Sequence, residues 1–198
     1  MSSHALAAHY VNAAHAAIQA KQHAQAKQYG ELALALNPGI AEAWFNLGLA
    51  QAGLKHREPA LKALLRARDL AAHSADGLNS IGLQLMSLHA ETEAEACYQQ
   101  AIRLAPNLAL PLSNLGNLRH LQHRFTEAES LHRLAVERAP DRAALHLNLG
   151  GALHGQRRYA DAAASIRRAL ELEPDSAAVW LSLGTVYVME NKLQEAVD

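Results

Sequence analysis

Twelve histidines and a single cysteine are the residues of this 198-residue chain that could bind a metal ion or act as nucleophiles. His120 and His123 are three residues apart, so a helix would place both imidazoles on one face. His89 and His154 stand in comparable positions before and after them. No cysteine or carboxylate completes a set at local spacing, and closed zinc sites need four ligands. We therefore expect no metal site and interpret these histidines as solvated residues of turns.

Motifs that position a nucleophile or a phosphate are missing from the sequence. It contains no Gly-x-Ser-x-Gly, no Gly-rich phosphate loop and no His-Glu-x-x-His. Cys97, the only cysteine, is expected to be a half-buried, inert thiol. The sequence thus predicts no catalytic residue and no cofactor. Because one cysteine cannot form an internal disulfide, it also favours a reducing, cytoplasmic location.

The charges are balanced, with 18 basic residues against 19 acidic ones. Such a chain offers no strongly basic surface, so nucleic acid is not an expected partner. Its unbroken apolar runs are only a few residues long, which argues against a membrane span. Arginines are frequent in the second half, where acidic residues accompany them, and we expect a solvated, ion-paired outer face.

The spacing of the prolines indicates a repeat of 34 residues. The structural elements of this repeat must position every side chain considered above. Pro106, Pro140 and Pro174 are 34 residues apart, and Pro38 lies two periods before Pro106. Residues 1–6 precede the repeats as an N-terminal extension. The predicted blocks are 7–40, 41–74, 75–108, 109–142, 143–176 and a partial block 177–198.

Small residues recur at fixed positions in every block. Position 20 is always alanine, and position 8 is glycine from the second block onward. Small residues let two helices approach closely where they cross, and large residues fill the space around the crossing. His132 and His146 occupy such large positions, so we expect partly buried rings there. The run Thr126–Glu129 reads as a capping box that opens a second helix.

This pattern of a large residue, Leu-Gly, two alanines and a proline resembles the tetratricopeptide repeat family over residues 7–198. The resemblance implies an all-α fold, a right-handed α-solenoid of antiparallel helix pairs with about five and a half repeats. The first helix of each pair would line the concave side. Ala14, Gly30 and Ala72 depart from the family pattern, and Gly30 is expected to loosen the first repeat.

The first-helix surface is the expected binding site for a protein partner, through an extended or helical peptide. Asparagines recur at position 6, and each amide can donate and accept hydrogen bonds to a peptide backbone. Asparagine at this position also occurs in ordinary repeats, and neighbouring repeats can bury the apolar residues. The predicted binding residues are Asn12, Asn46, Asn114, Asn117, Asn148, Phe45, Leu49, Leu83, Met86, Leu147 and Leu181.

Three alternatives concern the wider role of the array. Chaperone-tail binding in this family uses basic residues on adjacent first helices, whereas position 2 here carries Glu42 and Asp76, which argues against it. Asparagine ladders similar to this one occur in O-linked N-acetylglucosamine transferases, so the chain could be the substrate-recruiting arm of a glycosyltransferase or a sulfotransferase. The last block stops at Asp198, 22 residues into its period. We therefore expect a longer native array, or self-association through the uncapped final repeat.

Overall fold

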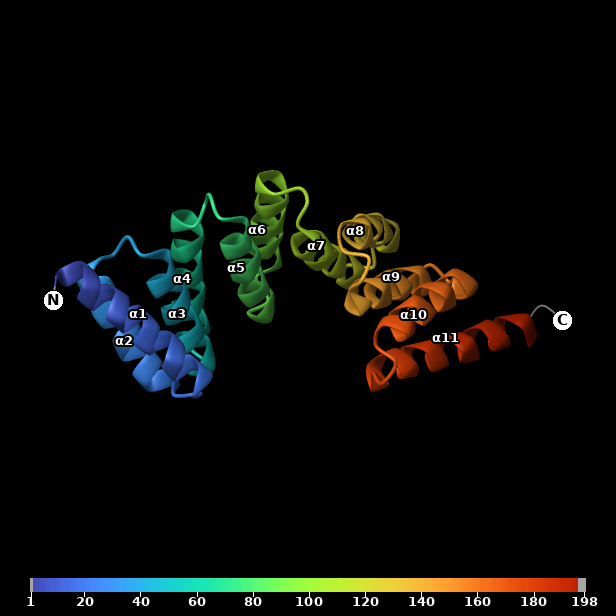
Figure 1. The fold of residues 1–198 in the computed structure, drawn as a ribbon, viewed down its shortest axis with the longest axis horizontal. Coiled ribbons are helices and arrows are strands. Elements are labelled where there is room, and N and C mark those ends of the chain that lie inside the picture. Colours follow the sequence, from blue (N-terminus) through green and yellow to red (C-terminus); the bar gives the residue numbers. More distant parts are fainter. Residues whose placement is uncertain (1, 196–198) are drawn as a thin grey trace. The chain divides into compact units, whose positions relative to one another are not determined.

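The computed structural model describes residues 2–195, with side chains up to residue 191. Within this range the chain forms eleven α-helices and no strands (Figure 1). The helices are α1 (Ser3–Gln19), α2 (His23–Leu36), α3 (Ala41–Gly53), α4 (Arg57–Leu70), α5 (Ala75–Ser87), α6 (Glu91–Leu104), α7 (Ala109–Leu121), α8 (Phe125–Arg138), α9 (Ala143–Gly155), α10 (Tyr159–Leu172) and α11 (Ala177–Glu195). The all-α solenoid of helix pairs predicted from the sequence is confirmed.

Each complete repeat is a pair of helices joined by a short turn. The turn contains one non-glycine residue with a positive φ, always at position 15 of the block. This left-handed conformation ends the first helix and lets the chain reverse. Helix α1 begins at Ser3, so most of the expected N-terminal extension 1–6 forms its first turn. The positive-φ residues are Lys21, Lys55, His89, His123 and Arg157.

Glycine at position 8 receives the large residue of the second helix. A Cβ built on Gly82 would lie 2.5 Å from Tyr98, and one on Gly116 would lie 2.6 Å from His132. Gly48 and Gly150 face the second-helix residues Leu64 and Ile166 in the same way. The pairing explains the recurrent Leu-Gly of the sequence, because any larger residue would push the two helices apart.

The first repeat packs differently from the others. Its position 8 is Ala14, which is fully buried, and its position 24 is the buried Gly30. A Cβ on Gly30 would lie 3.4 Å from the Cβ of Leu47 in the next repeat. The missing side chain is therefore matched by a close approach of α3 and not by an empty space.

Three blocks share a hydrogen bond between a ring and a proline. The indole nitrogens of Trp44 and Trp180 donate to the carbonyl oxygens of Pro38 and Pro174, both at 2.9 Å. His146 makes the equivalent contact, 2.8 Å from Nε2 to the carbonyl oxygen of Pro140. A carbonyl oxygen only accepts, so Nε2 of His146 carries the hydrogen.

The predicted capping box at Thr126–Glu129 is wrong. Helix α8 already begins at Phe125, its N-cap Arg124 makes no side-chain cap bond, and Thr126 lies inside the helix. Glu129 instead binds the guanidinium groups of Arg133 at 2.8 Å and Arg158 at 2.9 Å. The carboxylate has stronger, charged donors within reach than a backbone N–H, and the Arg158 pair ties the fourth repeat to the fifth.

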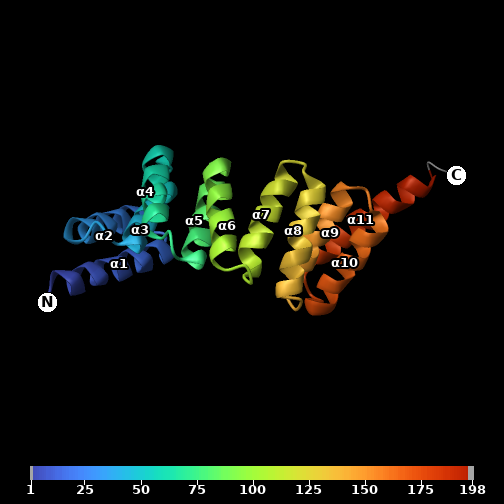
Figure 2. The ribbon, with the colours of Figure 1, turned by 90° about the horizontal axis from the view of Figure 1, so that it is seen from above.

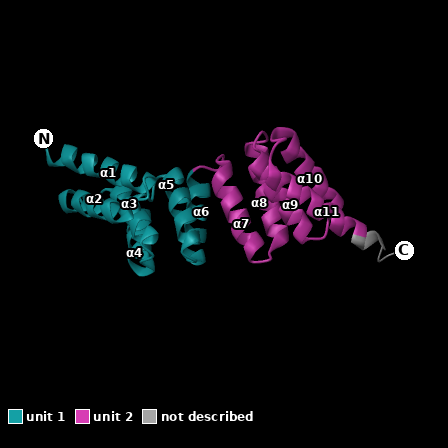
Figure 3. Cartoon of the chain, turned by 90° about the horizontal axis from the view of Figure 1, so that it is seen from below, with its two compact units in different colours: residues 1–104 teal, residues 105–198 magenta. Residues whose placement is uncertain are grey.

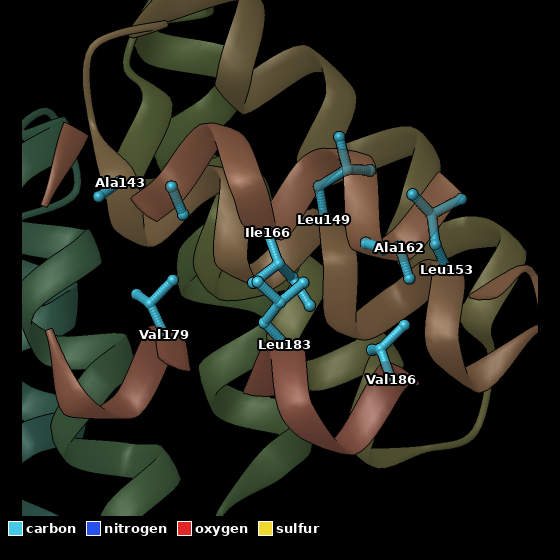
Figure 4. Close-up of a cluster of buried hydrophobic side chains, with 10 residues drawn as sticks. Ala143, Leu149, Leu153, Ala162, Ile166, Val179, Leu183 and Val186 are labelled. Carbon is cyan, nitrogen blue, oxygen red and sulfur yellow. The ribbon is translucent and has the colours of Figure 1, made fainter. Parts of the chain in front are cut away.

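The chain falls into two compact units, Met1–Leu104 and Ala105–Asp198 (Figure 3), where the sequence alone suggested one continuous array. Within the second unit, α7 to α11 follow one another in chain order (Figure 2). Val179, Leu183 and Val186 of α11 are buried against side chains of α9 and α10, including Leu149 and Ile166 (Figure 4). The end of the partial repeat, with Ala196, lies outside the described residues.

Candidate functional site

A cavity of about 470 Å³ lies in the first unit between two consecutive first helices, α3 and α5. Phe45, Leu70 and Ile81 supply apolar side chains to its lining. Glu42 and Asp76, both exposed, add two acidic side chains from the first turns of α3 and α5. The cavity therefore combines an apolar floor with a negative rim.

A second cavity, of about 300 Å³, lies within the second unit. Consecutive first helices again supply most of its wall, here α7, α9 and α11, while α8 and α10 each add one side chain. The lining residues are Asn117, His120, His132, Leu147, Asn148, Gly150, Gly151, His154, Ile166, Ser182, Thr185 and Val186.

Three histidines of this lining form one cluster. His132 is 1% exposed, and neither of its ring nitrogens has a hydrogen-bond partner among the described residues. Nε2 of His154 is also buried without a partner. Burial, together with the nearby His120, lowers the pKa of His132 to about 4. Burial likewise lowers the pKa of His120, helped by His123 and His154.

These positions correct part of the sequence interpretation. The expectation of solvated turn histidines is wrong for His120 and His154, which stand at position 12 inside their helices. His120 packs edge-on against Phe125 at 5.1 Å between ring centroids, and His154 lies 5.5 Å from Tyr159. Each ring fits between the two helices of its own pair because position 12 precedes the turn. His132 is fully buried, deeper than the partly buried ring expected from its position in the repeat.

The asparagines of the predicted ladder have different environments. Asn46 is 4% exposed, and its Nδ2 donates to the carbonyl oxygen of Val11, 3.2 Å away. Nδ2 of Asn148 donates to the hydroxyl of Ser113 at 3.0 Å. Both bonds join a first helix to the first helix of the preceding repeat, so these amides hold the repeats together. Asn114 is half-buried, whereas Asn12 and Asn117 are exposed.

The predicted apolar residues also vary in exposure. Leu83 is 44% exposed and Leu181 is 74% exposed, while Phe45, Leu49, Met86 and Leu147 are half-buried. Leu147 packs against the buried cluster formed by α9, α10 and α11, which agrees for this residue with the alternative of burial by a neighbouring repeat. Leu83 and Leu181 are accessible to solvent.

The cavities gather some of the predicted residues and add others. Asn117, Leu147 and Asn148 line the cavity of the second unit, and Phe45 lines that of the first. Ser182 and Thr185 were missed. Their hydroxyls donate to the carbonyl oxygens of Ala178 and Leu181 within α11, so their lone pairs are available to accept. Their places at positions 6 and 9 of the last block were the signal that could have found them.

The remaining features are the thiol of Cys97, metal binding and the capacity to span a membrane. Cys97 is fully buried, deeper than expected, and burial raises the pKa of its thiol to about 11. Among the residues that the structure describes, no three histidine, cysteine or acidic side chains are arranged to hold a metal ion. In the same part of the chain no helix has both the length and the apolar character needed to cross a membrane.

Sequence profiles described as Tetratricopeptide repeat match residues 115–170 and 152–198 in one form and residues 8–40 and 75–108 in another. Together the matches cover more than half of the chain. The chain belongs to the tetratricopeptide repeat family, an architecture that serves as a scaffold for protein interactions. A search of curated proteins finds no match.

Solved structures share the fold at low sequence identity. PilF of Pseudomonas aeruginosa has a TM-score of 0.77 and 18% identity, covering 96% of this chain and 87% of that one. YrrB, described as a tetratricopeptide repeat protein with an unusual peptide-binding site, has a TM-score of 0.68 and 20% identity over 87% and 89%. A chain of the APC/C hetero-tetramer Cut9-Hcn1 has a TM-score of 0.70 and 20% identity over 93% of this chain, which spans only 37% of that one.

Proposed function

We propose that this chain is a non-catalytic scaffold that binds peptide segments of partner proteins on the first-helix face of each unit. The observation that carries the proposal is that both cavities lie between consecutive first helices and contain residues predicted to bind. Concave pockets with apolar walls and a few polar groups are typical ligand sites. YrrB, whose description includes a peptide-binding site, adds support by analogy.

The chemistry of the first-unit cavity suggests the kind of segment it accepts. Its apolar floor, with Phe45 and Ile81, would bury an aliphatic or aromatic anchor. Glu42 and Asp76 on the rim would attract a lysine or arginine next to that anchor. We therefore expect a basic residue adjacent to an apolar one in peptides that bind this unit.

Selection from a phage-displayed library of random twelve-residue peptides, with the full chain as target, tests the proposal. Peptides enriched by the chain are then measured by calorimetry. Leu83→Ser, at an exposed position of the first helix α5, should weaken the binding of a first-unit peptide at least tenfold, about 1.4 kcal/mol. Leu32→Ser is the matched control, because Leu32 is also 44% exposed but lies on the second helix α2. Equal effects of the two changes, or no enriched peptide, would refute the proposal.

The asparagine ladder needs its own variant. Asn148→Ala would remove the bond to Ser113 as well as a peptide contact, so its effect would be ambiguous. Asn117 is exposed and lines the second cavity. We expect Asn117→Ala to weaken a second-unit peptide several-fold without changing the melting temperature. Unchanged affinity would count against a role for this amide.

A specific observation also favours self-association through α11. Trp180 and Leu181 on this helix are 55% and 74% exposed. Such an exposed apolar patch is typical of an interaction surface, and a second copy of the chain could cover it. Sedimentation velocity should show a dimer that Leu181→Asp weakens; a monomer at all concentrations would refute this.

A further inference from the structure

The histidine-lined cavity of the second unit contains buried polar atoms that the chain itself does not satisfy. Both ring nitrogens of His132 and Nε2 of His154 are buried without a partner among the described residues. A buried polar group without a hydrogen bond costs about 1–3 kcal/mol. Both side chains belong to the lining of this cavity, so a ligand placed there could supply the missing partners.

His132 is unusual among the large second-helix residues that pack against the position-8 glycines. The same position holds Leu64 in α4, Tyr98 in α6 and Ile166 in α10. Leucine and isoleucine fill the space beside the glycine without any polar side-chain atom, so packing alone does not require an imidazole. Histidine at this one position adds a hydrogen-bond donor and an acceptor, and both ring nitrogens lie beside Gly116 without a partner among the described residues.

The remaining lining determines which chemical group would fit. Among its twelve residues, all of them described, none is lysine, arginine, aspartate or glutamate. A charged ligand group would lose its hydration there without gaining a countercharge. The amide of Asn117 donates and accepts, and the hydroxyl oxygens of Ser182 and Thr185 are free to accept because they donate within α11. Leu147 and Val186 add apolar wall for methylene groups.

We propose that this cavity binds the carboxamide side chain of a glutamine in a partner peptide. A carboxamide is uncharged and presents both N–H donors and a carbonyl acceptor, which matches the mixed donors and acceptors of the wall. The two methylenes of glutamine can lie against Leu147 and Val186. The cavity volume, about 300 Å³, suits one side chain and its flanking backbone. The inference rests on the proposed peptide binding and names the side chain that one site accepts.

Three blocked tripeptides provide the test, because they differ only at the end of one side chain. Acetyl-Ala-Gln-Ala-amide, its Glu analogue and its Met analogue are titrated into the full chain at pH 7.5. Histidine ring nitrogens are observed by long-range ¹H–¹⁵N correlation, which reports which nitrogen carries the hydrogen. We expect the Gln peptide to shift the His132 and His154 signals saturably and to bind at least tenfold more tightly than the other two. A site built to hydrogen-bond discriminates strongly against analogues that lack the group.

His132→Leu is the informative variant, because Leu64 fills the same position in the second repeat and the fold should tolerate it. It should abolish the preference for Gln over Met and leave the melting temperature unchanged or higher. His73→Ala, at an exposed histidine of the first unit, should leave the preference intact.

Several outcomes would overturn the inference. They are equal binding of the three peptides, an unchanged preference in His132→Leu, and tight stoichiometric binding of Zn²⁺ that displaces the Gln peptide and marks a metal site instead. If library peptides bind while the three tripeptides do not differ, only the glutamine assignment fails. If no peptide binds at all, the proposed function fails with it.

Discussion

Acid should destabilise the second unit because of one buried imidazole. His132 has a pKa near 4 in the folded chain, lowered from 6.5 mainly by burial and also by His120. As the pH falls below about 6.5, the unfolded chain takes up a proton at this residue and the folded chain does not. The contribution of neutral His132 to stability is therefore complete above pH 7 and is lost as the pH falls towards 4.

The size of the loss follows from the shift of the pKa. Each unit corresponds to about 1.4 kcal/mol, so the free energy of unfolding should fall by about 3 kcal/mol between pH 7 and pH 4. The pKa of His120 is also lowered, which adds a loss of the same sign.

Glu129 affects stability in a different pH range. Hydrogen bonds from Gln156, Arg133 and Arg158 outweigh burial and lower the pKa of Glu129, so its contribution is lost only as the pH falls below the ordinary range of a carboxyl group.

The two tryptophans allow each unit to be followed separately. Trp44 belongs to the first unit and Trp180 to the second, so the Trp44→Phe background reports the second unit by fluorescence. Urea unfolding between pH 7.5 and 4 should show the predicted slope for His132 and a much smaller slope after His132→Leu. Parallel pH profiles for the two proteins would show that His132 is not the titrating group and would refute the reasoning.

Three further predictions concern stability and reactivity. Gly30→Ala should raise the free energy of unfolding by about 0.5–1 kcal/mol, because alanine has a higher helix propensity than glycine and the new Cβ would lie 3.4 Å from Leu47. A lower melting temperature would show that α3 cannot move to accommodate the added methyl group. Lys55→Gly should stabilise by up to about 1 kcal/mol, since Lys55 has a φ of 64° and glycine adopts this conformation without strain. Lys62→Gly, at an exposed position inside α4, should instead destabilise. Cys97 should not react with a thiol reagent such as dithiobis-nitrobenzoate at pH 8 until the chain unfolds, because its thiol is fully buried and has a pKa of about 11. Rapid labelling of the native chain would contradict this.

The helix pairs and the approximate places of their turns could be predicted from the sequence, because they depend on local patterns that recur at a fixed period. Position 8 glycines and position 20 alanines record which faces must approach closely. The positive φ at position 15 has no such signature, since lysine, histidine and arginine occupy it. There the structure of the two packed helices imposes the turn conformation on residues that do not prefer it.

The candidate site depended far more on tertiary structure. Asn46 and Asn114 occupy the same position of the repeat as Asn12, yet Asn46 is buried against Val11 and Asn12 is exposed. A period shows which residues share a face but not which of them a neighbouring repeat covers. The same limit applies to His132, whose position in the repeat suggested a partly buried ring. Only the packing of α7 to α11 shows that its nitrogens are buried without a partner among the described residues and that its side chain lines a cavity, because five helices together build that environment.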